Sequence, residues 1–244
     1  SDFRVESDSN THMLFVDAGN NSIGINNSTP GSYDAGADDL VVGDHSVSSQ
    51  GITIASDDNS ILYFADGTSG DEKYRGSIIY NHPADNFIIR TAGFNTRMTI
   101  DSTGAVTIPN QPAFLASPAS NQNDISINSA VDVVFGTEVY DQNGDFASNT
   151  FTAPVTGKYQ FNITIYMSDF DASADYLQID LDTSNRDYHT IMETTDEDGY
   201  MGMTIAALAD MDANDTAKVV FYQGSGAAQV NITTGSRFSG FLAC

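Results

Sequence analysis

The residues that could do chemistry in this 244-residue chain are mostly carboxylates, because 33 Asp and Glu stand against 9 Lys and Arg for a net charge of −24. The best-spaced set is Asp169, Asp171 and Asp175, with Ser173 between them. Alternate loop residues of this kind can converge on one ion, and calcium takes six to eight hard oxygen ligands. Asp210 and Asp212 form a second alternating pair. Both sets are therefore candidate calcium ligands.

The same acidic sets have a plainer interpretation as solvated turns. Ala174 stands where an EF-hand loop requires Gly for its sharp turn. Strand-like rather than helical segments flank the first set. Structural calcium and ordinary acidic turns both stay open, and we expect no other cofactor.

Catalytic motifs are missing from the sequence. It contains no Gly-x-Ser-x-Gly elbow, no phosphate-binding loop and no dinucleotide fingerprint. Pairs of carboxylates alone would permit a glycosidase, but a sugar-cutting groove is typically rich in aromatic side chains and this chain has no Trp. We therefore expect a non-enzymatic protein, with a polysaccharide depolymerase as the least favoured alternative.

Charge and composition also restrict the partners. A chain of net charge −24 is unsuited to nucleic acid or to an anionic membrane surface. The single cysteine, Cys244, excludes an intrachain disulfide, and no apolar run approaches the roughly 20 residues of a membrane span. The chain begins without a signal-peptide pattern and already within a strand-like run, so we expect it to be a piece of a longer protein.

Short β-branched and aromatic runs, separated by Gly, Asn, Asp and Ser, fill residues 1–108 at intervals of about ten residues. This pattern predicts a β-rich region without helices. Several runs are apolar at consecutive positions, so both of their faces need cover. Threefold association, with equivalent strands of three chains around a shared axial core, would supply that cover.

A boundary is predicted at residues 109–112, where Pro109 and Pro112 interrupt strand pairing. Beyond it, residues 113–244 contain about ten longer runs typical of a β-sandwich or jelly roll. The clearest strand is 159–166, in which large apolar side chains alternate with polar ones. Residues 200–209 are predicted to form a strand rather than a helix.

The C-terminal region carries specific motifs. Residues 151–161 are FTAPVTGKYQF and residues 238–242 are FSGFL. Residues 113–244 thereby resemble the globular head of complement component 1q and the related tumour-necrosis-factor-like jelly rolls. The resemblance implies a ten-strand jelly roll that forms homotrimers and binds through exposed loops or its apex. The residues that carry the core and trimer motif are Phe135, Phe151, Pro154, Gly157, Tyr159, Phe161, Phe238, Gly240, Phe241 and Leu242.

The N-terminal region has a second resemblance. Residues 39–45 (DLVVGDH), 61–67 (ILYFADG), 74–82 (YRGSIIYNH) and above all 97–106 (RMTIDSTGAV) are similar to the repeat-rich shafts of phage tail fibres. The resemblance implies an interwoven trimeric β shaft that carries a distal head. Arg97 and Asp101 are expected to have structural roles.

Together these observations predict an all-β protein with a trimeric interwoven shaft (1–108), a short linker (109–112) and a trimerising jelly-roll head (113–244). The expected function is that of the distal, receptor-binding part of a phage tail fibre, located at the fibre tip of a virion. Its partners would be two further copies of itself and a host-surface glycan or protein. The alternative is an extracellular lectin-like adhesin of bacterial origin.

Overall fold

The structure is a computed structural model that describes residues 2–194 and 199–244. The chain divides into two compact units, residues 1–87 and residues 88–244. Strands dominate both units, and the helical segments of the described residues are two short 3-10 helices, η1 (Pro30–Ser32) and η2 (Gly70–Tyr74). In the part of the chain that the structure describes, no helix has the length and apolar character needed to cross a membrane.

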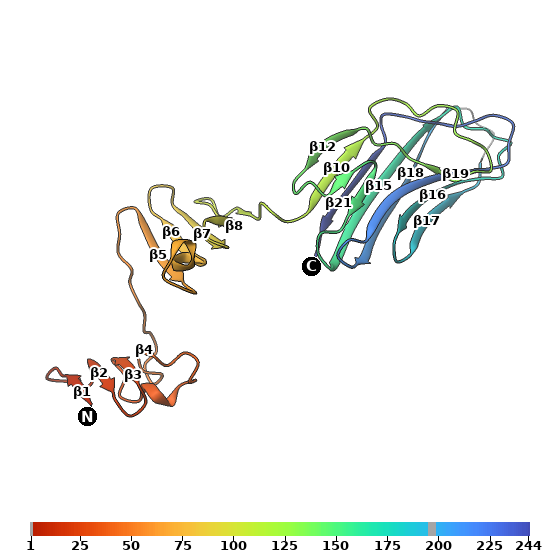
Figure 1. Cartoon of the computed structure of the whole chain (residues 1–244). Helices are drawn as coiled ribbons and strands as arrows, with labels where there is room; N and C mark the ends of the chain where they lie inside the picture. The colour runs from red at the N-terminus through yellow and green to blue at the C-terminus, as the bar shows by residue number, and fades with distance from the viewer. Residues whose placement is uncertain (1, 195–198) are drawn as a thin grey trace. The chain divides into compact units, whose positions relative to one another are not determined.

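The first unit is built from short strands (Figure 1). They are β1 (Phe3–Val5), β2 (Leu14–Asp17), β3 (Ser22–Ile25), β4 (Leu40–Val42), β5 (Asn59–Phe64) and β6 (Gly76–Asn81). The first four form one sheet in the order β1-β2-β3-β4. Pairing within that sheet is antiparallel except between β3 and β4, which are parallel. β5 and β6 pair antiparallel, and the next strand, β7 (Asn86–Thr91), spans the boundary between the units.

One face of the four-stranded sheet is closed by its own chain. Phe15 and Gly24 lie opposite each other on this face and are buried beside Pro30 of η1. The Asn27 side chain donates a hydrogen bond to the Gly43 carbonyl at 2.7 Å, which holds the covering segment in place. A side chain at Gly24 would come within 2.3 Å of the Asn27 carbonyl oxygen. This close approach explains why glycine stands at a strand position of a half-buried sheet.

Within the second unit, β8 (Asn95–Ile100) and β9 (Val106–Thr107) pair antiparallel. The carboxylate of Asp101 closes the turn between them by accepting bonds from the Thr103 and Ala105 amides at 2.9 and 3.0 Å. Gly104 supplies the positive φ of 85° that the turn needs. The expected structural role of Asp101 thus has a local cause. Arg97 donates to the Thr91 hydroxyl at 2.9 Å.

Residues 113–242 form a sandwich of two sheets (Figure 1). The first sheet has the order β12-β10-β21-β15-β18 and the second β13-β14-β19-β16-β17. The strands are β10 (Ala113–Ser117), β11 (Val131–Asp132), β12 (Thr137–Asp141), β13 (Phe146–Ala147), β14 (Thr150–Thr152), β15 (Gly157–Ser168), β16 (Tyr176–Thr183), β17 (Asp187–Met192), β18 (Tyr200–Met211), β19 (Thr216–Gly224), β20 (Asn231–Ile232) and β21 (Arg237–Leu242). The two-residue strands β11 and β20 attach to β19 and β15 outside the main order.

This architecture confirms the predicted all-β class and the jelly roll, with five strands on the main path of each sheet. The last strand, β21, lies between β10 and β15, so the end of the head pairs with its beginning. The segment predicted as a strand at 200–209 is β18, and it pairs with β15 over the whole length of that strand. The interwoven trimeric shaft and the boundary at 109–112 stay predictions.

The Asn143-Gly144 dipeptide, a pair typical of tight hairpin turns, does not close a hairpin here. β12, which precedes it, pairs with β10, whereas β13, which follows it, pairs with β14 in the other sheet. Gly144 has a positive φ of 74°. The dipeptide therefore makes the tight turn that its chemistry favours, but the turn carries the chain from one sheet to the other.

A core of interlocking aromatic rings lies between the two sheets. The inward positions of β15 are all buried, from Tyr159 and Phe161 to Ile165 and Met167. The Phe161 ring meets those of Phe151 and Phe238 at centroid distances of 5.6 and 5.8 Å. Burying one such ring contributes about 1.5–3 kcal/mol. The head therefore has a complete core within a single chain.

Candidate interaction surfaces

The motif residues of the head divide between the core and the surface. Phe135, Phe151, Tyr159, Phe161 and Phe238 are all buried inside one chain. These rings build the subunit's own core and are not available to a second copy. In contrast, Pro154 is exposed, Gly157 and Leu242 are half-buried, and Phe241 points outward from β21 with 45% of its surface exposed.

Gly240 lies on β21 at the point where two rings of the core pack against this strand. Its strand partners are Phe114 on one side and Phe161 on the other. A Cβ atom at this position would lie 2.6 Å from Cδ1 of Phe161 and 2.8 Å from Cε1 of Phe114. The glycine in the FSGFL ending thus leaves room for the two rings to pack on the backbone.

The outward face of the first sheet has two cross-strand rows without charged residues. One row joins Tyr140, Leu115, Ser239, Asn162 and Ala206, and the other joins Ala113, Phe241, Gln160 and Leu208. We call these nine positions the neutral head face. Leu208 is its most exposed large aliphatic side chain, with 54% of its surface open. Charged residues lie outside the neutral head face. Lys158 and Asp210 lie opposite each other beyond one end, and Arg237 lies beyond the other.

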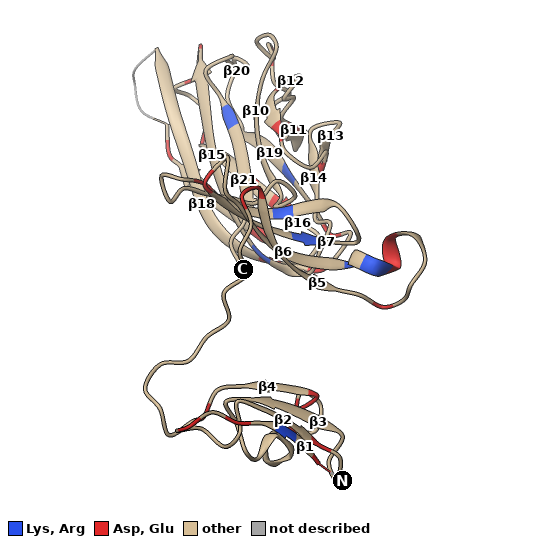
Figure 2. Ribbon diagram, turned by 90° about the vertical axis from the view of Figure 1, so that its left-hand side faces the viewer, with Lys and Arg blue, Asp and Glu red and all other residues tan. Residues whose placement is uncertain are grey.

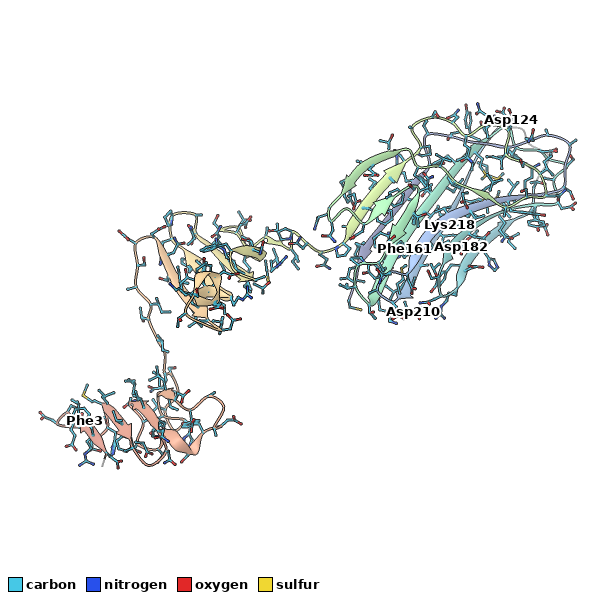
Figure 3. All side chains as sticks on the ribbon, viewed as in Figure 1. Phe3, Asp124, Phe161, Asp182, Asp210 and Lys218 are labelled. Atoms are coloured by element: carbon cyan, nitrogen blue, oxygen red, sulfur yellow. The ribbon has the colours of Figure 1, made fainter. Side chains whose placement is uncertain are left out.

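The two acidic sets lie at opposite ends of the long β15–β18 pair. Asp169, Asp171 and Asp175 follow the end of β15 at which Ser168 pairs with Tyr200. Asp210 and Asp212 lie where Gly157 pairs with Met211, and Figure 3 shows Asp210 at its end of the sandwich. Within the described residues, no group of three or more His, Cys, Asp and Glu could hold a metal ion. The structure does not unite the two sets, and calcium binding stays a prediction.

The Asp171 carboxylate is engaged by the backbone of a distant loop. It accepts hydrogen bonds from the amides of Ala227 and Ala228, the latter at 2.7 Å, and from the amide and hydroxyl of Ser173 at 2.8 and 2.7 Å. These bonds, led by the Ala228 amide, hold the pKa of Asp171 well below its usual range. Each bond favours the ionised form of the carboxylate. Together the bonds connect residues 171–173 to residues 227–228.

Replacing Asp171 with Asn is expected to loosen this connection. The folded-state pKa is lowered, so the stabilisation is present above the unfolded pKa and disappears as the pH falls through the folded value. At pH 5 the Ala227 and Ala228 amides should therefore exchange hydrogen several-fold faster in Asp171→Asn than in the unsubstituted chain. Asp169→Asn is the control, because Asp169 contacts the Asn231 amide group at 2.7 Å instead. Equal exchange rates in all three chains would contradict this role.

The calcium prediction is checked by a chelator. A bound structural ion stabilises the folded state by mass action, so its removal lowers the melting temperature. If either acidic set holds calcium, then EDTA lowers the Tm and added calcium restores it. An unchanged melt would contradict a structural calcium ion at either set.

Asp210 and Asp212 border a shallow cavity of about 420 Å³. It is lined by Thr156, Gly157, Lys158, Asn185, Asp210, Met211, Asp212 and Cys244. Asp210 forms an ion pair with Arg186 at 2.7 Å, and Asp212 accepts a bond from the Thr156 hydroxyl at 3.4 Å. A glycoside-cleaving site needs two carboxylates close together. Asp210 and Asp212 do not form such a pair with the set at Asp169, Asp171 and Asp175, because the two sets lie at opposite ends of the sheet.

The outward face of the second sheet is charged, unlike the neutral head face. Lys218 reaches Asp132 at 2.9 Å and Asp182 at 3.8 Å, and Figure 3 shows Lys218 and Asp182 on this side. Burial, together with the nearby Asp187, raises the pKa of Asp182. Figure 2 shows how few basic residues the whole chain has among its acidic ones. Sequence reasoning did not single out Lys218, since only strand pairing brings its partners together.

Tyrosine rings can stack on sugars, and five tyrosines of the head lie in different places. Tyr188 packs against the core, and Tyr140 belongs to the neutral head face. Tyr176 and Tyr222 stack on each other on the second sheet with ring centroids 5.7 Å apart. Tyr200, at the start of β18, has 83% of its surface exposed. These rings therefore form no single platform.

Comparison with known proteins gives a family match over the head. Residues 113–243 match the family described as C1q domain. Among solved structures, the globular domain of zebrafish complement 1qA protein is 19% identical, with 55% of this chain and 98% of that chain covered and a TM-score of 0.41. Murine APRIL at pH 5.0 is 14% identical, with 54% and 98% covered and a TM-score of 0.40. No curated protein matches the chain.

Proposed function

The chain belongs to the C1q-domain family through residues 113–243, and from this premise we propose that it is a homotrimeric, receptor-binding end piece of a phage tail fibre. C1q domains are trimeric recognition modules and are typically extracellular and non-enzymatic. The head would bind a host-surface glycan or protein, and the N-terminal region would space and align it. Three identical heads raise the strength of weak single-site contacts through avidity.

The neutral head face is the observation that supports the trimer. Its Leu208 and Phe241 side chains are about half exposed on a sheet whose opposite side is fully packed. A chain of net charge −24 repels its own copies, so a surface without carboxylates favours contact between them. The nine positions of the neutral head face offer such a surface, and the second sheet, with Asp132, Asp182 and Asp187, does not.

Light scattering and surface binding test the proposal together. We expect a mass of three times 26.1 kDa and binding of the trimer to intact cells within a panel of bacterial strains. Antibodies against the chain should label the fibre tips of a virion in electron micrographs. A monomer, or a trimer that binds no strain of a broad panel, would count against the proposal.

Two other functions give different outcomes in the same experiment. A lectin-like adhesin of bacterial origin would bind cells in the same way, but antibodies would label bacterial surfaces or culture fluid and not virus particles. A depolymerase would release reducing ends from purified capsular polysaccharide or lipopolysaccharide, whereas an adhesive protein releases none. The separated acidic sets favour the adhesive protein.

A further inference from the structure

Two tyrosines of the head meet on the outward face of the second sheet, although the five described above form no single platform. Tyr176 begins β16 and Tyr222 lies near the end of β19, with ring centroids 5.7 Å apart and ring planes 25° from parallel. Gly224 is the strand partner of Tyr176, and a Cβ atom there would lie 2.7 Å from Cε1 of the Tyr176 ring. The glycine therefore lets this ring lie across the backbone of the neighbouring strand. We call the two rings the tyrosine pair.

The tyrosine pair lies at the end of the head that is remote from the linker. The linker meets the head where Gln111 donates a hydrogen bond to the Leu242 carbonyl at 2.7 Å, and Leu242 pairs with Tyr159 near the start of β15. β15 has 12 residues, so its far end lies about 35 Å away, and residues 169–175 connect that end to Tyr176. The pair also stays open when copies associate through the neutral head face, because it is on the other sheet. It is therefore accessible where an end piece would meet a host surface.

Two loops beside the tyrosine pair are held together by a side-chain amide. They are residues 118–130 and 225–230. The Asn128 side-chain oxygen accepts hydrogen bonds from the Ser225 amide at 2.9 Å and from the Tyr222 hydroxyl at 3.5 Å. Asn128 thus connects both loops to one ring of the pair. A surface that is already ordered loses little conformational entropy when a ligand binds.

Hydrogen-bonding groups of both kinds border the rings. Because the Asn128 oxygen is engaged, the amide nitrogen of this exposed side chain is the donor that it offers to a ligand. Gln178, the strand partner of Tyr222, donates its Nε2 group to Asp180 at 2.8 Å and offers its oxygen as an acceptor. A sugar ring has the complementary form, since its C–H groups can stack on an aromatic ring while its hydroxyls both donate and accept. An apolar protein contact would leave these polar groups unpaired, which costs free energy.

Charge restricts the sugar to a neutral one. Asp175 and Asp180 flank Tyr176 along the chain, and Asp175 accepts a hydrogen bond from the Ser225 hydroxyl at 2.8 Å. Lys and Arg are absent from the segments that surround the pair, residues 118–130, 175–180 and 222–230. A carboxylated or sialylated sugar would therefore be repelled.

We propose that the tyrosine pair, with Asn128 and Gln178, is a binding site for a neutral pyranose sugar. The sugar ring stacks on the aromatic rings, and the two side-chain amides bond its hydroxyls. This inference rests on the proposed function, because it names the chemical class of the host-surface receptor and the face of the head that recognises it. Three such sites in the proposed trimer would add weak single contacts together through avidity.

Saturation-transfer NMR with simple glycosides tests the site in the full chain. The neutral probes are the methyl glycosides of glucose, galactose, mannose, rhamnose and N-acetylglucosamine, and the charged probes are those of glucuronic and galacturonic acid. We expect at least one neutral glycoside to receive saturation, strongest at the C–H protons of one ring face, and the charged probes to receive several-fold less. Binding of none of the neutral glycosides overturns the site. Equal transfer to the charged probes overturns the restriction to neutral sugars.

Substitutions show whether the bound glycoside lies on the tyrosine pair. Tyr222→Ala should weaken its binding roughly tenfold through the loss of one stacked ring, whereas Tyr222→Phe keeps the ring and should retain most of the affinity. Asn128→Asp removes the donor but keeps the oxygen that Ser225 contacts, so it should weaken binding several-fold. Tyr200→Ala is the matched control, because Tyr200 is exposed at the same end of the head but lies on the other sheet. Unchanged binding in both Tyr222→Ala and Asn128→Asp, or an equal loss in Tyr200→Ala, overturns the site.

Binding to bacterial cells separates this inference from the proposed function. Cell binding that Tyr222→Ala abolishes, without binding of any glycoside, shows that this face contacts a protein and overturns the sugar site. Cell binding that persists in Tyr222→Ala and in an excess of the bound glycoside overturns the site as the receptor contact and leaves the adhesive function intact. A chain that binds a neutral glycoside through the tyrosine pair but binds no cells supports the site and counts against the proposed function.

Discussion

Leu208→Asp is expected to convert the proposed trimer into single chains at micromolar concentration while the fold of the head is retained. Leu208 lies in the neutral head face beside Gln160, with Phe241 on the next strand, and more than half of its surface is open. In a trimer its side chain would be desolvated against another copy. An unpaired carboxylate buried at an interface costs about 3–5 kcal/mol, which corresponds to at least a hundred-fold weaker association per contact.

The control for this substitution is on the other sheet. Ile191, on β17, has 52% of its surface exposed, close to the value for Leu208, but it lies outside the neutral head face. Ile191→Asp adds the same charge and should keep the three-chain mass in light scattering. Unchanged far-ultraviolet circular dichroism in both variants would show that the sandwich remains folded. If Leu208→Asp remains trimeric, then the contact between heads lies elsewhere.

Gly240→Ala is expected to destabilise the head by about 3 kcal/mol, the upper end of the range for overpacking a core. The added methyl would lie within 3 Å of both the Phe161 and the Phe114 rings, and each ring is held by further rings of the cluster. Neither ring can move without displacing its neighbours, because protein cores are closely packed. Urea denaturation of the full chain, followed through the head's circular dichroism, measures the loss in the free energy of unfolding.

Two further variants show whether the steric explanation is correct. In Gly202→Ala the new methyl would lie 3.4 Å from the nearest atom of Tyr166, an ordinary contact, so this change should cost less than about 0.5 kcal/mol. Phe161→Leu frees space beside residue 240, so it should cost less in the Gly240→Ala background than alone. Additive effects in the double variant would contradict the proposed clash, because residues in contact do not act independently.

The sequence indicated that the first unit has an exposed apolar surface, but not which residues form it. For the first unit, apolar residues at consecutive strand positions were enough to predict that single chains leave faces uncovered. The structure places Phe3, Ile23 and Leu40 on one exposed apolar face of the four-stranded sheet. The composition of this face could not be derived beforehand, since Leu40 joins Ile23 only through the parallel pairing of β3 with β4 across an intervening segment.

The calcium hypothesis stays a prediction, and the structure adds what spacing along the chain could not show. Asp171 has the right neighbours in sequence, but its carboxylate bonds to amides 56 and 57 residues away. Asp210 is bonded instead to Arg186 on a neighbouring connection. Local patterns reveal which residues can act as ligands, whereas hydrogen-bond donors from distant loops decide whether those ligands are already engaged.

By itself, the sequence determined the all-β class, the jelly roll and the burial of every second residue in 159–166. Strand periodicity and tight-turn chemistry act over a few residues and can be recognised without coordinates. Only the tertiary structure decided that Phe241 and Leu208 share one neutral face, that the acidic sets lie at opposite ends, and that Gly240 accommodates two rings. These relations depend on strand order and register, which join residues far apart in the chain through contacts that no local pattern encodes.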